Sequence, residues 1–197
     1  MPWTFYDGSG NKLNTVATSG VLQNVVEDLT PQLGANLDLN GFNLAFPATQ
    51  TADAGANVLD DYEEGTFTPQ IADATGDGSG EGQVYGQQVG TYTKIGDRVF
   101  GTFVVEITNL GTLTGANSCT IVGWPFATVN NASERPVFSI EGSSLALTAG
   151  YNLIARAEPN TSIFGVQVYN AASGIYAMTI TELSVNGTLR GVFQYRV

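Results

Sequence analysis

The chain of 197 residues contains no histidine and a single cysteine, Cys119. The lack of histidine excludes Ser-His-Asp and Cys-His catalysis and histidine-based metal sites. One cysteine allows neither an intrachain disulfide nor a multi-cysteine zinc site. Because Cys119 lies in the apolar run Cys119–Val122, we expect it to be a buried small hydrophobic residue rather than a nucleophile.

Charge is also scarce. Charged residues make up 13% of the chain, and lysine occurs only at Lys12 and Lys94. The net charge of −11 argues against nucleic acid or an anionic lipid surface as the main partner. No run approaches the roughly 18 apolar residues of a membrane span, so we expect no membrane insertion. The start, Met1–Asp7, lacks the pattern of a secretion signal.

What the chain does contain is typical of a mainly β protein with many tight turns. Hydrophobic residues reach 43%, glycine occurs 24 times, and threonine, valine and aromatic residues are plentiful. Gly96-Asp97 separates two β-rich runs and predicts a hairpin with a type II′ turn. Alternation in the second run places Val99, Gly101, Phe103, Val105 and Ile107 on one face, while Phe100 and Val104 join its polar face.

Asn186-Gly187 predicts a second hairpin, joining Met178–Val185 to Thr188–Val197. In the last of these strands, alternation places Leu189, Phe193, Tyr195 and Val197 on one face. Further β-rich runs cover residues 135–141, 145–157 and 162–170. Several short strands with frequent turns predict an antiparallel β-sandwich or jelly-roll-like domain over residues 59–197.

Residues 1–58 are interpreted as an N-terminal stalk or attachment segment ending in a linker. Thr4–Tyr6 is a possible short strand, Asn40-Gly41 is a turn signal, and one helical pattern runs from Ser19 to Pro31. This helix of two to three turns is too short to be stable alone. Copies around a threefold axis are its simplest partner, and packing on its own domain is the alternative. The candidate residues of a trimer seam are Leu22, Val25, Val26 and Leu29.

Two stretches of the sequence resemble bacteriophage tail-fibre proteins. Residues 26–41, VEDLTPQLGANLDLNG, are similar to a segment of predicted phage fibres. Residues 59–69, LDDYEEGTFTP, followed by residues 90–99, GTYTKIGDRV, resemble the opening of a β-rich domain near the distal end of many fibres. Gly123–Phe126 fits a "GLPF" element of that family, with Trp124 where leucine is usual. The resemblance covers about the middle half of the chain.

The resemblance implies a virion structural protein, and we expect a homotrimeric tail fibre that attaches the particle to its host. The partners would then be further copies of the chain, other tail or virion proteins, and a host surface glycan or protein. A capsid decoration or head-fibre protein with a purely architectural role is the alternative. A polysaccharide depolymerase is a third hypothesis.

Two polar clusters have residue types that could serve as chemical sites. Asp60, Asp61, Glu63 and Glu64 are the densest group of carboxylates, and two carboxylates can serve a glycosidase. Because the cluster lies where the linker meets the domain, we interpret it as solvated and expect no catalytic residues. Asp73–Glu81 has calcium-type spacing, but Val84 stands where the bidentate glutamate belongs. We expect no cofactor and no metal, and the question of an ion in this loop stays open.

Aromatic and amide residues of the last third are the better functional candidates. The candidate receptor contacts are Tyr151, Asn152, Tyr169, Asn170 and Tyr176, with Gln167 nearby in sequence. Tyrosine with asparagine or glutamine suits sugar binding through stacking and hydrogen bonds, and suits protein contacts equally. The alternative is that these tyrosines are core or trimer-interface residues.

Overall fold

The computed structural model describes residues 9, 40–46, 59, 61–73, 78–79 and 81–197. The chain divides into two units, residues 1–45 and 46–197. In the first unit, Asn40 and Gly41 form a turn with φ of 46° and 86°, as the Asn-Gly pair predicts. The predicted helix with Leu22, Val25, Val26 and Leu29 and the predicted strand Thr4–Tyr6 lie outside the described residues. These predictions and the domain boundary at residue 59 stay untested.

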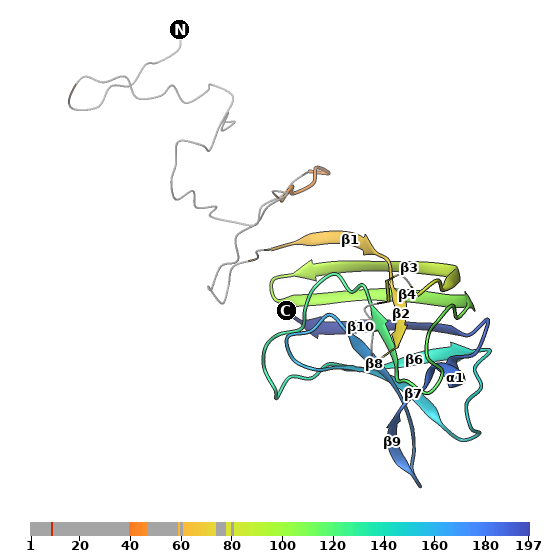
Figure 1. Ribbon diagram of the computed structural model, residues 1–197. Coiled ribbons are helices and arrows are strands. Elements are labelled where there is room, and N and C mark those ends of the chain that lie inside the picture. The colour runs from red at the N-terminus through yellow and green to blue at the C-terminus, as the bar shows by residue number, and fades with distance from the viewer. Residues whose placement is uncertain (1–8, 10–39, 47–58, 60, 74–77, 80) are drawn as a thin grey trace. The chain divides into compact units, whose positions relative to one another are not determined.

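Within the described residues, the second unit consists of ten strands and one short helix (Figure 1). The sheet order is β1-β3-β4-β10-β6-β7-β8-β5-β2, with β9 paired to β8, and the pairings are antiparallel. The mainly β, antiparallel fold class predicted from the sequence is thus confirmed. The elements are β1 (Glu63–Phe67), β2 (Gln70–Asp73), β3 (Val84–Ile95), β4 (Arg98–Asn109), β5 (Cys119–Val122), β6 (Val137–Ser143), β7 (Asn152–Ala157), β8 (Phe164–Asn170), β9 (Gly174–Ala177), α1 (Ile180–Leu183) and β10 (Thr188–Arg196).

Strand β6 carries the sheet from one half to the other. Its residues 140–143 pair with β10, whereas its residues 137–139 pair with β7. The first half, β1, β3, β4 and β10, therefore lies beside a second half of β7, β8, β5 and β2 (Figure 1). Phe103 and Phe193 from the first half and Ile121 and Phe164 from the second share one core. The domain is therefore one curled antiparallel sheet whose two halves contribute to a shared core.

Glycine and aromatic residues alternate across the inner face of the first half. A Cβ on Gly90 would lie 2.3 Å from the Phe67 ring, and one on Gly101 would lie 2.4 Å from the Phe193 ring. Each ring therefore occupies space that a side chain on the neighbouring strand would need. The paired residues form two adjacent rows, Gly65–Tyr92–Gly101–Phe193 and Phe67–Gly90–Phe103–Gly191.

The hairpin predicted at Gly96-Asp97 is confirmed. Strands β3 and β4 pair up to Ile95 and Arg98, with Gly96 and Asp97 as the two loop residues. Only Gly96 has a positive φ, 56°, as the first central residue of a type II′ turn requires. The predicted inner faces are also confirmed, because their large side chains are buried in β4 and in β10. These buried side chains are Val99, Phe103, Val105, Ile107, Leu189, Phe193 and Tyr195.

The hairpin predicted at Asn186-Gly187 is wrong, because the segment before it is not a strand. Residues 180–183 form α1 instead, and β10 pairs with β4 and β6. A capping box begins this helix: the Thr179 hydroxyl accepts from the Glu182 N–H, and the Glu182 carboxylate accepts from the Thr179 N–H at 2.8 Å. Burial of Ile180 and Leu183 holds it against the core.

Instead of closing a hairpin, Asn186 and Gly187 form backbone hydrogen bonds with β4. Asn186 N donates to Ile107 O at 2.7 Å, and Ile107 N donates to Gly187 O at 3.0 Å, so the turn is anchored on β4. Of the other predicted β-rich runs, residues 162–170 contain β8, and residues 135–141 contain most of β6, which continues to Ser143. In residues 145–157 the strand begins only at Asn152, because a turn occupies residues 149–150.

Candidate functional site

Trp124 is the centre of the aromatic core rather than part of a surface site. Its ring centroid lies 4.4 Å from Phe164, 4.7 Å from Phe193 and 5.3 Å from Phe103. The indole N–H donates to Ile121 O at 2.9 Å, so its polar atom is satisfied inside the protein. The element that resembles the fibre family's "GLPF" is thus a structural anchor.

Cys119 is buried, as the sequence predicts, with 0% of its surface exposed. Burial, and secondarily the charge of Glu182, raises the pKa of its thiol to about 12. The neutral thiol packs in the core as a small apolar group.

Each described carboxylate of the acidic cluster has a partner in its own domain. Asp61 forms an ion pair with Lys94, whose side chain is almost fully buried. Glu63 accepts a hydrogen bond from the Tyr92 hydroxyl, and Glu64 accepts one from the Tyr62 hydroxyl.

Two of these contacts, Asp61–Lys94 and Glu63–Tyr92, join β1 and the residues just before it to β3. The hydrogen bond to Glu63 is the main cause that raises the pKa of Tyr92 to about 12, ahead of burial and the charge of Glu63. Because neighbouring residues of a strand point to opposite faces, Glu63 and Glu64 cannot flank one substrate. Asp60 lies outside the described residues.

The described residues of the Asp73–Glu81 segment also form hydrogen bonds with other parts of the domain. Asp73 is 2% exposed, and its Oδ2 accepts from Thr114 N at 3.0 Å and from Asn117 Nδ2 at 3.1 Å. At the other end of the loop, Gln83 Nε2 donates to Gly78 O at 2.8 Å. Among the described residues, no group of three metal-ligating side chains occurs. Nor does a helix of the described residues have the length and apolar character to cross a membrane.

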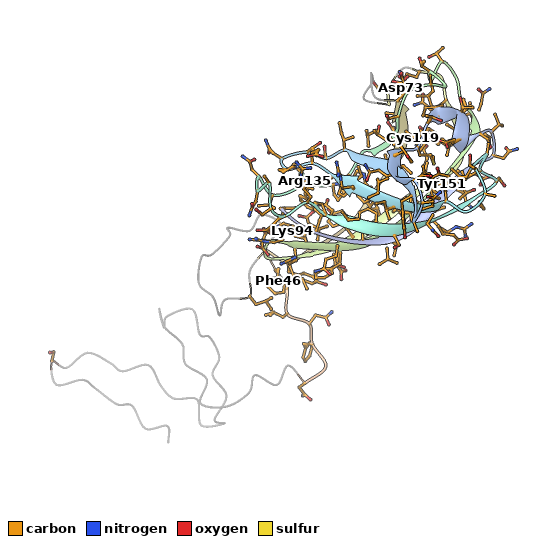
Figure 2. All side chains as sticks on the ribbon, turned by 90° about the horizontal axis from the view of Figure 1, so that it is seen from below. Phe46, Asp73, Lys94, Cys119, Arg135 and Tyr151 are labelled. Carbon is orange, nitrogen blue, oxygen red and sulfur yellow. The ribbon has the colours of Figure 1, made fainter. Side chains whose placement is uncertain are left out.

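The five candidate receptor contacts come together at one end of the domain, where the β8–β9 hairpin projects (Figure 1). Asn152 of β7 pairs with Tyr169 of β8, and Asn170 is the last residue of β8. The rings of Tyr151 and Tyr176 lie 6.5 Å apart. Tyr151 lies far from Lys94, at the opposite end of the domain (Figure 2).

The ribbon of β7, β8 and β9 divides these five residues between its two faces. Asn152 and Tyr169 share the outer face with Ile175, because directly paired residues of an antiparallel sheet point the same way. Tyr176 pairs with the buried Val168, so it belongs to the inner face. We call the outer face of this ribbon the tip face.

Two of the five residues have structural tasks. Asn170 Oδ1 accepts from Ala172 N at 3.0 Å and from Ser173 N at 2.6 Å, which shapes the turn between β8 and β9. The Tyr176 hydroxyl donates to Ser173 O, which fastens its ring to the same turn. Asn170 and Tyr176 therefore support the tip, and Asn152 and Tyr169 present side chains on it.

A second exposed apolar area lies on the outer face of β4, β10 and β6. Val192 is 70% exposed, Val137 53% and Phe100 40%. Three shallow hollows of about 450, 500 and 580 Å³ surround Val192. The alternation pattern had placed Phe100 and Val104 on the polar face, but Val192 was missed among the polar residues of the last strand.

Comparison with known proteins shows the fold. No protein-family model and no curated protein sequence matches the chain. Among solved structures, the Dettilon tailspike protein (gp208) is similar with a TM-score of 0.54 and 14% sequence identity. The match covers 68% of this chain and 23% of the tailspike chain, so the chain corresponds to less than a quarter of that protein. This protein therefore has a β fold that also occurs in a phage tailspike.

Proposed function

We propose that this protein is a bacteriophage tail protein, specifically a homotrimeric tail fibre that attaches the virion to its host. The observation that carries the proposal is the fold shared with a phage tailspike protein. The fibre-like segments at residues 26–41 and 59–69 support the same assignment. The attachment role is further supported by the projecting tip, which places exposed aromatic and amide side chains at the end of the domain.

The proposed role is binding without catalysis. Asp61, Glu63 and Glu64 each have a partner in the domain, which supports a structural use of the acidic cluster. Weak contacts at three tips per fibre and several fibres per virion would give strong adsorption through multivalency. With a net charge of −11 per chain, attraction to an anionic cell envelope is not the source of this adsorption.

Adsorption is the direct test. Host cells are preincubated with the purified full chain, and phage adsorption is then measured at low and high ionic strength. The proposal predicts that saturating protein blocks adsorption and that blocking persists in high salt, because contacts between uncharged groups are little screened. Failure of the protein both to bind cells and to block phage would contradict it.

The position on the particle separates the tail fibre from a capsid decoration protein. Antibody against the full chain, viewed by electron microscopy of intact virions, should label the tail. Labelling over the capsid lattice would replace the attachment role with the architectural one.

The trimer is tested by light scattering of the full chain. A mass of three chains is expected, and a monomer of 20.7 kDa at micromolar concentration would contradict the proposal. Leu22→Asp or Val26→Asp should weaken assembly, because it buries an unpaired charge in each copy. Val192→Asp is the comparison: if it alone dissociates the protein, the seam lies on the outer sheet face and not in residues 22–29.

A further inference from the structure

The tip face carries two neighbouring rows of uncharged side chains. In the first row Asn152, Tyr169 and Ile175 are directly paired across β7, β8 and β9, and in the second row Ile154, Gln167 and Ala177 are paired. Paired residues point to the same side of a sheet, so these six side chains form one continuous surface. Arg156, the next outward residue of β7, is already ion-paired with Glu158 at 2.8 Å.

Gln167 is the unusual member of this surface. Its Oε1 is buried, yet it accepts no hydrogen bond from any described residue. Its cross-strand neighbours, Ile154 and Ala177, have no side-chain donors. An unsatisfied buried acceptor is costly, and a turn of the amide about its last side-chain bond would bring Oε1 to the outer face, where a donor from outside the chain can reach it.

Tyr169 stands two residues from Gln167 on the same face and is 37% exposed. Ile175, 58% exposed, and the exposed Asn152 flank it on the neighbouring strands. An aromatic ring offers a flat apolar surface to the C–H face of a sugar ring, and the amides beside it can exchange hydrogen bonds with the sugar hydroxyls. Such a mixture of one apolar platform and a few placed polar groups is the usual form of a small-ligand site.

We propose that the tip face, centred on Tyr169 and Gln167, binds a neutral saccharide of the host surface. This inference rests on the proposed attachment function and supplies its ligand class. Both rows lack charge, which favours a neutral ligand over an anionic polysaccharide, and the chain's net charge of −11 acts in the same direction. In this proposal the Gln167 amide turns outward and its Oε1 accepts from a sugar hydroxyl, Tyr169 stacks on the sugar ring, and Asn152 bonds a second hydroxyl.

The test measures binding of the labelled full chain to three preparations of host cells: untreated, oxidised with periodate and digested with protease. Periodate cleaves the vicinal diols of sugars, so it should abolish binding, whereas protease should leave binding unchanged. Tyr169→Ala should weaken binding to untreated cells about tenfold, and Gln167→Ala should do so severalfold. Tyr169→Phe keeps the ring and should bind within about twofold of the parent. Gln194→Ala and Val89→Ala, exposed residues on β10 and β3, are the matched controls.

The outcomes separate this site from the function on which it rests. If the parent binds cells and Tyr169→Ala binds equally well, the saccharide site is overturned while attachment stands. If protease treatment of the cells abolishes binding and periodate treatment does not, the partner is a protein and the proposed ligand class is overturned. A change of oligomeric mass in Tyr169→Ala also overturns the site, since the face would be an interface between copies. No binding by the parent overturns the attachment function itself. Circular dichroism and thermal unfolding confirm that each variant is folded.

Discussion

Aromatic residues gather at two places in this domain, and their exposure differs sharply. Around Trp124, which is 5% exposed, rings from both halves of the sheet pack at centroid distances of 4.4 to 6.4 Å. At the tip, Tyr169 and Tyr176 are 37% and 50% exposed. Aromatic side chains therefore stabilise the fold around Trp124, whereas at the tip Tyr169 offers part of its ring as a surface. Position in the curled sheet decides between the two uses.

Loss of the central ring should break the core and give the largest effect. Trp124→Ala is expected to lower the free energy of unfolding by about 3–5 kcal/mol, because it removes a large buried side chain and leaves a cavity. Urea unfolding followed by circular dichroism measures this change. Val192→Ala, at a site 70% exposed, is the control and should change stability by less than about 0.5 kcal/mol. A loss below about 1 kcal/mol at Trp124 would show that the core does not depend on its ring.

Substitution of glycines on the inner face should cause the second-largest loss of stability. Gly90→Ala would place a Cβ 2.3 Å from the Phe67 ring, so an expected loss of about 1–3 kcal/mol follows from overpacking. Gly165→Ala is the matched strand control, because its Cβ would lie 3.6 Å from the nearest heavy atom, Arg156 O. Equal stability of the two variants in urea unfolding would refute the alternation of rings and glycines as a packing requirement.

The turn at the tip should show a smaller, local effect. Asn170→Ala removes the acceptor of the Ala172 and Ser173 amides, and we expect their opening free energy to fall by about 1 kcal/mol. Hydrogen exchange of those two amides measures it. Asn170→Asp keeps the acceptor oxygen and should exchange like the parent. Unchanged protection in the alanine variant would mean that Asn170 does not shape the turn.

The smallest expected change in stability is at the tip face itself. Tyr169→Ala should alter the free energy of unfolding by no more than about 0.5 kcal/mol, since the ring is exposed. The same variant is expected to lose cell binding. A stability loss as large as that of Trp124→Ala would erase the contrast between the two aromatic groups.

Much of the first half of the sheet was predictable from local patterns. The Gly96-Asp97 turn and the alternation in residues 99–107 indicated β3, β4 and the buried face of β4. The tertiary structure adds a reason for the two parts of the second fibre-like stretch, residues 59–69 and 90–99. Residues 65–67, Gly-Thr-Phe, pair antiparallel with residues 90–92, Gly-Thr-Tyr, so that each ring lies opposite a glycine. Sequence reasoning identified both motifs but not that they are partners, because pairing across this distance leaves no local signal.

The wrong prediction at Asn186-Gly187 has a physical cause. An Asn-Gly pair favours positive φ, and Asn186 does have a φ of 65°. That preference is satisfied equally by a turn after a helix, and the capping pair of Thr179 and Glu182 selects the helix. The pairing of β10 with β4 and β6 was decided by distant strands, which the pattern of the last residues cannot specify.

For the candidate receptor contacts too, the sequence predicted one part and the tertiary structure decided the rest. The sequence singled out Tyr151, Asn152, Tyr169, Asn170 and Tyr176 as candidate receptor contacts, and the structure places them at one end of the domain. The faces on which they lie were not predictable. Asn170 is committed to a turn, and Tyr176 lies on the inner side of the ribbon. The sequence also offered no reason to single out Gln167. Its Oε1 lacks a hydrogen-bond donor among the described residues because the paired residues, Ile154 and Ala177, have apolar side chains.

By itself, the sequence determined the mainly β class, the exclusion of histidine chemistry and the burial of Cys119, because composition and a period of two are local properties. The tertiary structure alone decided the order of the strands, the curl through β6 and the exposure of Tyr169 beside Gln167. Alternation states which residues share a face, but it does not state what covers that face. Burial is settled by residues far away in the chain, and these come together only in the folded sheet.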